Sequence, residues 1–189
     1  MLSRLRSLLS RLFKSRRRAG GPGRGLVLFE DARDAMRAES VLKERGFEVR
    51  AVAPPPEVRE GCDLAIEFDL VDETGVRRAL EEAGIEPLKV LPLKDPSLRP
   101  LELTRVKEVG GYLMIRCGNV KVTVDRDGTI VNVSGGGCPD VPYLARELIG
   151  ENVLELEEDR MPARLGRTLC AYTLDKAVQE ARRVLREGR

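Results

Sequence analysis

The sequence predicts an α+β protein in which a ferredoxin-like βαββαβ domain is followed by a small domain of a β-meander and helices. Two observations lead to this prediction. Between residues 25 and 95, short apolar segments and segments of helical periodicity follow the order strand, helix, strand, strand, helix, strand. Beyond residue 105, strand-like segments come first and helical segments follow. A chain of 189 residues is long enough for two such domains.

The elements of the first domain, residues 25–95, are each marked by a local pattern. The predicted strands contain short apolar runs or alternation, and the predicted helices are closed by glycines. In chain order they are a strand at Leu26–Glu30, a helix at Asp31–Gly46, strands at Phe47–Ala53 and Leu64–Asp69, a helix at Val71–Ala83 and a strand at Pro87–Leu93.

The second domain, residues 105–189, follows a proline-containing connector at residues 96–104. Its predicted meander has three strands and a hairpin turn at Asp127-Gly128. A glycine-rich bend then leads into a helix for which Asp140 is the expected N-cap. These elements are strands at Tyr112–Cys117, Val120–Asp125 and Thr129–Ser134, and helices at Asp140–Leu148 and Leu169–Arg186.

The N-terminal segment, residues 1–24, holds eight Lys or Arg residues and no acidic residue. Leucines at helical spacing in Met1–Arg18 predict a basic amphipathic helix, which a glycine-rich linker separates from the first domain. Such a segment could bind an anionic membrane surface or a partner, or be disordered alone. Residues 25–95 have a net charge of −7, so we expect no nucleic-acid partner.

The composition excludes several classes of function. The chain contains no histidine, which removes Ser-His-Asp and Cys-His nucleophilic sites and every metal site with an imidazole ligand. No apolar run has the ~18–20 residues of a membrane span, and no cleavable signal peptide is visible. We therefore expect a cytoplasmic protein, with peripheral attachment to a membrane through residues 1–18 as an additional option.

Four cysteines are the main candidates for chemistry, and none forms a C-x-x-C pair. Cys117 ends a predicted strand, whereas Cys138 and Cys170 each lie near a helix start, where the helix dipole favours a thiolate. These three ends could converge, so that their sulfurs hold a metal ion or an iron–sulfur cluster. The alternative is that all three are small packing residues. Three glycines before Cys138 favour a reachable thiol, and we expect it to be the most reactive.

The second domain also carries a resemblance. Cys117-Gly118-Asn119-Val120, Gly137-Cys138 and the segment from Cys170 to Val178 resemble iron–sulfur scaffold proteins of the NifU/IscU type and, equally, the TSCPD domain, over residues 108–187. The scaffold resemblance implies that Cys117, Cys138 and Cys170 are cluster ligands. Asn119 stands where the scaffold family has an aspartate, and Leu165 where the TSCPD pattern has a further cysteine.

The first domain, over residues 25–95, resembles the Se/S carrier-like family of small domains. The segments LVLFEDARDAMRAESVLKERGFEV and PPPEVREGCDLAIEF carry this resemblance. The family has a cysteine after a proline-rich bend, usually followed by glycine. Cys62 is the matching residue here, with Asp63 in place of the glycine. The resemblance implies that Cys62 carries a persulfide or selenium. Its neighbours Glu60 and Asp63 are acidic, and only Arg59 offsets them in sequence.

We therefore predict a sulfur or selenium carrier, or an accessory protein of iron–sulfur cluster assembly, which transfers cargo rather than turning over a small substrate as an enzyme does. Cys62 would accept sulfur, and the three C-terminal cysteines would receive it or bind a cluster or a single metal ion. The expected partners are a desulfurase-type sulfur donor and an apo-protein acceptor. The alternative is a non-catalytic adaptor tethered by its basic N-terminal helix.

Overall fold

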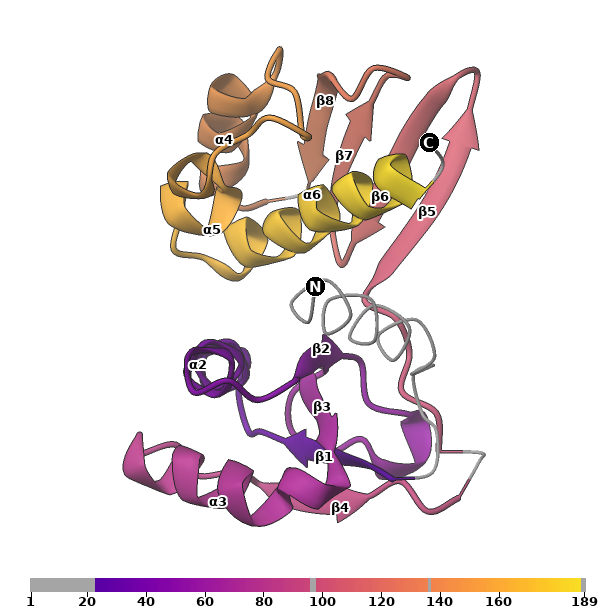
Figure 1. Ribbon diagram of the computed structural model, residues 1–189. Coiled ribbons are helices and arrows are strands. Elements are labelled where there is room, and N and C mark those ends of the chain that lie inside the picture. The colour runs from indigo at the N-terminus through magenta and orange to yellow at the C-terminus, as the bar shows by residue number, and fades with distance from the viewer. Residues whose placement is uncertain (1–22, 96–97, 136, 188–189) are drawn as a thin grey trace, which may run out of the picture. The chain divides into compact units, whose positions relative to one another are not determined.

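The computed structural model describes residues 23–95, 98–135 and 137–187, which belong to two compact units that meet in sequence between Leu101 and Glu102 (Figure 1). Each unit has its own four-stranded antiparallel sheet together with helices. This combination confirms the predicted α+β class. The predicted amphipathic helix at Met1–Arg18 lies outside the described residues.

The first unit has the predicted order of elements. Its sheet has the strand order β2-β3-β1-β4 with antiparallel neighbours, which is the arrangement of a split βαβ fold. Two short 3₁₀ helices, Pro56–Val58 and Leu70–Asp72, lie in its loops. The elements are β1 (Arg24–Leu28), α2 (Ala32–Glu44), β2 (Arg50–Val52), β3 (Ala65–Asp69), α3 (Glu73–Glu82) and β4 (Lys89–Pro92).

Local chemistry explains where α2 begins and how β1 is held. The Asp31 side chain accepts a hydrogen bond from the Asp34 N–H at 2.9 Å, so Asp31 caps the helix. Arg24, which the sequence pattern assigned to the basic tail, is the first residue of β1. Its guanidinium lies 3.6 Å from a carboxylate oxygen of the buried Glu67 and 3.7 Å from one of Asp69. Arg24 therefore belongs to the folded unit.

The second unit contains one more strand than predicted. Its meander has the order β5-β6-β7-β8, and β5 begins in the segment that was predicted to be a connector. A 3₁₀ helix at Glu158–Arg160 and a short helix were also not predicted. The elements are β5 (Thr104–Val109), β6 (Tyr112–Cys117), β7 (Val120–Val124), β8 (Ile130–Gly135), α4 (Asp140–Leu148), α5 (Pro162–Leu165) and α6 (Leu169–Glu187).

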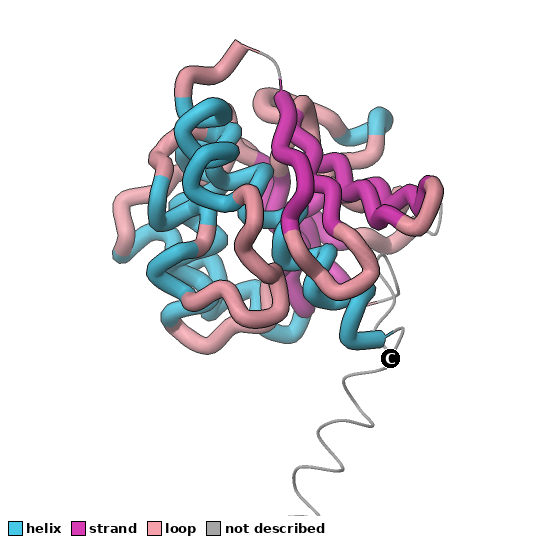
Figure 2. Tube along the Cα trace, turned by 90° about the horizontal axis from the view of Figure 1, so that it is seen from above, coloured by secondary structure: helices cyan, strands magenta, loops and turns pink. Residues whose placement is uncertain are grey.

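The core of the second unit lies between its sheet and its helices. Helix α6 contacts β6 and β7, and α4 contacts β8; Figure 1 shows α6 lying across this sheet, and Figure 2 distinguishes helices from strands by colour. Ile115 and Val122 from the sheet are fully buried with Leu174 and Val178 from α6. This packing, together with the contacts between α4 and α6, places the start of α6 next to the start of α4.

The alternate side chains of the same strands form an exposed cationic row. Arg105 of β5 pairs across the ladder with Arg116 of β6, which pairs with Lys121 of β7. All three side chains are exposed. Strand β5 is an edge strand, and Lys107 adds a further positive charge to it. Among the described residues, no helix has both the length and the apolar character needed to cross a membrane.

Candidate functional site

Cys62 lies in a tight turn that contacts the end of β1. Gly61 has a φ of +69°, and a Cβ at this position would come within 2.5 Å of the Phe29 carbonyl oxygen. The Cys62 N–H donates a hydrogen bond of 2.9 Å to that same oxygen. Only glycine fits such a conformation without strain. The turn therefore holds the Cys62 backbone in one place.

The sulfur of Cys62 is half-buried and has a hydrogen-bond donor of its own. The backbone N–H of Leu64 donates to Cys62 Sγ, with the nitrogen 3.3 Å from the sulfur. This hydrogen bond orients the sulfur relative to the turn. The turn thus presents a partly accessible sulfur with one fixed donor.

The acidic residues beside Cys62 are each balanced by a cation. The Lys89 ammonium, at the start of β4, lies 3.3 Å from a carboxylate oxygen of Glu60. The Arg59 guanidinium lies 3.2 Å from a carboxylate oxygen of Asp63. The sequence showed only Arg59 as an offset, because Lys89 is distant in the chain. The local charge around the turn is therefore close to neutral.

Cys138 and Cys170 are brought together at the starts of α4 and α6. Cys138 precedes α4 by two residues, and Cys170 is the second residue of α6. Both side chains are half-buried, and each is near enough to shift the pKa of the other. The Cys138 Sγ lies 3.3 Å from the hydroxyl oxygen of Thr168, which precedes Cys170 by two residues. These two thiols are therefore neighbours.

The pKa values of the two thiols are shifted in opposite directions. Contact with the Thr168 hydroxyl lowers the pKa of Cys138, and the Cys170 thiol and the Asp140 backbone N–H lower it further. Burial raises the pKa of Cys170 to about 11, and the adjacent Cys138 contributes in the same direction. Cys138 therefore ionises more readily, whereas Cys170 stays protonated at neutral pH.

Asp140 has a different role from the one predicted. It was expected to be the N-cap of α4, but the N-cap is Pro139, and Asp140 is already inside the first turn. Its carboxylate instead accepts a hydrogen bond of 2.8 Å from the Thr168 hydroxyl. A Cβ on Gly166 would come within 2.7 Å of the same carboxylate, so glycine there permits the contact. Asp140 thus joins the starts of α4 and α6.

Thr168, which the sequence reasoning missed, is central to this arrangement. Its hydroxyl oxygen accepts a hydrogen bond from the Ala171 N–H at 3.3 Å, as an N-cap of α6 does. Its place two residues before Cys170, at the start of a long helical pattern, was the available signal.

An open hollow leads to Cys138 on its solvent side. It has a volume of about 500 Å³ and is lined by the end of β8, the loop that follows it and the first turns of α4. Its lining includes Gly135, Gly137, Cys138, Val141 and Ala145. Cys138 is the cysteine in this lining, so a reagent entering the hollow meets it first.

Cys117 differs from the other two cysteines of this unit in that its side chain is buried. It ends β6 with 1% of its surface exposed, inside the apolar core of the second unit. Burial raises its pKa to about 11. Asn119, which the scaffold resemblance would align with an aspartate, is exposed in the turn after β6. Within the described part of the chain, no three Cys, Asp or Glu side chains form a group that could hold a metal ion. The structure therefore pairs Cys138 with Cys170 without adding Cys117 to a metal-binding set.

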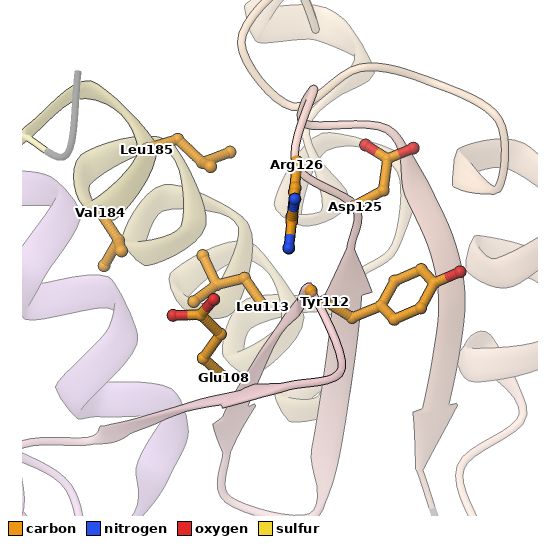
Figure 3. A pocket seen from close by; sticks show the side chains of 8 residues that line it. Glu108, Tyr112, Leu113, Asp125, Arg126, Val184 and Leu185 are labelled. Carbon is orange, nitrogen blue, oxygen red and sulfur yellow. The ribbon is translucent and has the colours of Figure 1, made fainter.

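A second pocket, of about 240 Å³, lies away from the cysteines (Figure 3). It is lined by the β5–β6 hairpin, the turn after β7 and the end of α6, and includes Glu108, Leu113 and Arg126. The carboxylate of Asp125, also in its lining, accepts hydrogen bonds from three successive backbone N–H groups of the turn. Asp125 therefore has a structural role there, and no thiol reaches this pocket.

Comparisons with known proteins divide the chain as the structure does. Residues 24–92 match the family described as "Putative Se/S carrier protein-like", and residues 103–189 match a "Domain of unknown function (DUF8182)". The chain is 58% identical over 154 residues to "Uncharacterized protein MJ0011" of Methanocaldococcus jannaschii, and this alignment covers 82% of the chain and 78% of the relative. No solved structure matches the chain. The Se/S carrier-like resemblance is confirmed, while the resemblance to NifU/IscU-type scaffolds or TSCPD domains stays a prediction.

Proposed function

Since this chain belongs to the family of protein MJ0011 from M. jannaschii and its first unit matches the Se/S carrier-like family, we propose that it is a sulfur or selenium carrier and that Cys62 is the carrying residue. The protein would take a sulfur atom from a donor and pass it to an acceptor. It would act as a transfer protein rather than as an enzyme with a small-molecule substrate.

In the loading step, the Cys62 thiolate attacks the terminal sulfur of a donor persulfide. A bond forms between Cys62 Sγ and this sulfur, and the sulfur–sulfur bond of the donor breaks. The donor leaves as a thiolate, and Cys62 becomes a persulfide, so that no external oxidant or reductant is needed. A selenium atom in place of the terminal sulfur would be transferred in the same way.

The observation that carries this proposal is the hydrogen bond from the Leu64 N–H to Cys62 Sγ in a turn fixed by Gly61. The donor holds the sulfur in one orientation before the attack. Half-burial leaves the sulfur open to a partner, and the ion pairs of Glu60 and Asp63 reduce the repulsion of an approaching anionic persulfide. A packing cysteine requires none of these features.

The partners that fit this chemistry are a desulfurase-type enzyme that presents a persulfide and an apo-protein that accepts the sulfur. Both must reach a side chain in a surface turn. Loops of this kind commonly present reactive groups from a rigid scaffold. The paired charges of Arg59, Asp63, Glu60 and Lys89 border the sulfur and would form the edge of such a contact.

The test is loading of the full chain with cysteine persulfide, followed by alkylation and peptide mass spectrometry. We expect the Cys62 peptide to gain the mass of one sulfur atom, with loss of this gain in Cys62→Ser. Cys117→Ala is the matched control, because the buried Cys117 should not compete for the donor. Absence of sulfur on Cys62 at any donor concentration that labels free cysteine in an unfolded control would overturn the proposal.

A further inference from the structure

The Cys138–Cys170 pair has the arrangement of an attacking thiol and a second thiol held beside it. Cys138 Sγ lies 3.3 Å from the hydroxyl of Thr168, two residues before Cys170, so Cys138 sits against the first turn of α6 that carries Cys170. Each thiol also shifts the pKa of the other. Disulfide formation requires two sulfurs that can approach to a bond length of about 2 Å. Two neighbouring thiols at the starts of α4 and α6 can meet this requirement with a small movement.

Thr168 provides a proton that can serve either of two acceptors. Its hydroxyl donates to the Asp140 carboxylate at 2.8 Å, and its oxygen lies 3.3 Å from Cys138 Sγ. A hydroxyl has one hydrogen, so it cannot donate to both at once. When Cys138 ionises, the hydroxyl can turn to the sulfur, while the Thr168 N–H, 3.3 Å from Asp140 Oδ2, still donates to the carboxylate.

The two sulfurs differ in what they face. Both side chains are half-buried and pack against the apolar core, but only Cys138 lines the open hollow of about 500 Å³. Gly137 in the same lining has a φ of +74° and nothing within 4 Å of a Cβ position, so the wall beside Cys138 is open. An external sulfur compound that enters this hollow would therefore react with Cys138, and Cys170 is placed to react with what Cys138 then holds.

We propose that Cys138 and Cys170 form a sulfide-releasing dithiol: Cys138 accepts a sulfane sulfur from a persulfide, and Cys170 then displaces it as sulfide by closing a disulfide with Cys138. This inference rests on the proposed function, since the dithiol would be a second site on the same chain that accepts sulfur. The dithiol would release sulfur as sulfide, the reduced form that cluster assembly or another sulfide-consuming reaction requires.

The step balances in atoms and electrons. Cys138 first becomes a persulfide as the donor leaves as a thiolate. The Cys170 thiol then passes its proton to the terminal sulfur as its own sulfur attacks Cys138 Sγ, the bond to the terminal sulfur breaks, and hydrogen sulfide ion departs with the electron pair. The terminal sulfur gains two electrons, and the two cysteines lose two as their disulfide forms. A low-molecular-weight thiol reductant, as an external co-reactant, returns the pair to the dithiol.

The experiment follows sulfur through the full chain in a single turnover. The reduced protein is mixed with glutathione persulfide, freed of donor by rapid desalting, and assayed for sulfide and for linked peptides by mass spectrometry. We expect the wild type to release close to one sulfide per chain and to yield a Cys138–Cys170 disulfide. Cys170→Ser should keep its sulfur on Cys138 until an external thiol is added.

Variants separate this inference from the proposed role of Cys62. Cys62→Ser should release sulfide as the wild type does, because the small donor reaches Cys138 directly, whereas Cys138→Ser should release none. Cys117→Ala is the control for loss of a thiol in the same unit. If Cys170→Ser releases sulfide at the wild-type rate, or if the wild type keeps a stable persulfide on Cys138, the dithiol mechanism is overturned, whatever Cys62 does.

Discussion

Replacing Thr168 by valine tests how the start of α6 controls both stability and the Cys138 thiol. Valine keeps the shape of threonine but removes the hydroxyl. The change removes the hydrogen bond to Asp140 at 2.8 Å, the N-cap bond from the Ala171 N–H at 3.3 Å and the contact with Cys138 Sγ. Thr168→Ser keeps the hydroxyl and is the matched control.

The expected loss of stability follows from these contacts. Loss of an N-cap costs about 1 kcal/mol, and loss of a hydrogen bond to a charged group costs about 1.5–3 kcal/mol. Asp140 is half-buried and keeps the Thr168 N–H as a donor, so the second figure applies at its lower end. The total is about 2–3 kcal/mol, or an increase of about 30- to 140-fold in the unfolded fraction of the second unit.

Cys117 provides the assay, because it is 1% exposed in the core of this unit and reacts only when the core opens. Its alkylation rate under native conditions, read by peptide mass spectrometry, should rise by that factor in Thr168→Val and stay near the wild-type value in Thr168→Ser. Cys138 should be alkylated more slowly at neutral pH in Thr168→Val, because loss of the hydroxyl raises its pKa. Unchanged Cys117 labelling in Thr168→Val, or equal effects of serine and valine, would refute the reasoning.

Three further predictions concern other parts of the chain. Gly61→Ala should destabilise the first unit by more than about 2 kcal/mol, since a left-handed φ costs about 1–2 kcal/mol and the new Cβ would lie 2.5 Å from the Phe29 carbonyl oxygen. Gly46→Ala is the control, because Gly46 has a φ of +84° and nothing within 4 Å of a Cβ position, so this variant should show the conformational cost alone. Hydrogen exchange of the β1 amides measures both losses of stability. The pH profile of alkylation should place the Cys138 midpoint below that of an ordinary cysteine and the Cys170 midpoint at about 11, and coincident midpoints would contradict the assigned acidities. Deleting residues 1–22, which hold seven Lys or Arg residues, should abolish binding to anionic vesicles and leave the thermal midpoint of unfolding unchanged. Vesicle binding that survives the deletion would argue against a membrane role for residues 1–22.

The sequence was sufficient for the first unit because its pattern is unambiguous. Apolar runs bounded by glycine and proline specified the elements, and the observed strand order is the one expected for a split βαβ fold. Strand β5 was missed because its side chains are mostly exposed and show no apolar alternation. The Gly110-Gly111 pair before β6, both with positive φ, was the hairpin signal that could have revealed it.

The sequence predicted where each cysteine of the candidate site lies in its element, but not which cysteines come together. Helix starts correctly indicated where Cys138 and Cys170 lie, because local capping and glycine signals are read directly from sequence. Which sulfurs meet depends on how α4 and α6 pack on the sheet, and this packing buries Cys117 instead of exposing it. Asp140 illustrates the same limit. Its sequence position suits an N-cap, but its carboxylate accepts a hydrogen bond from the hydroxyl of Thr168, 28 residues away.

The position of β5 at the edge of its sheet affects how the protein behaves at high concentration. An exposed edge offers unpaired backbone groups to which a second molecule could add a strand. Arg105 and Lys107 place positive charge along this edge, and the neighbouring Arg116 and Lys121 extend it across the open face. Two copies that approach edge to edge would bring these cations together. The side chains that made β5 hard to recognise thus protect the folded protein from aggregation through β-strand addition.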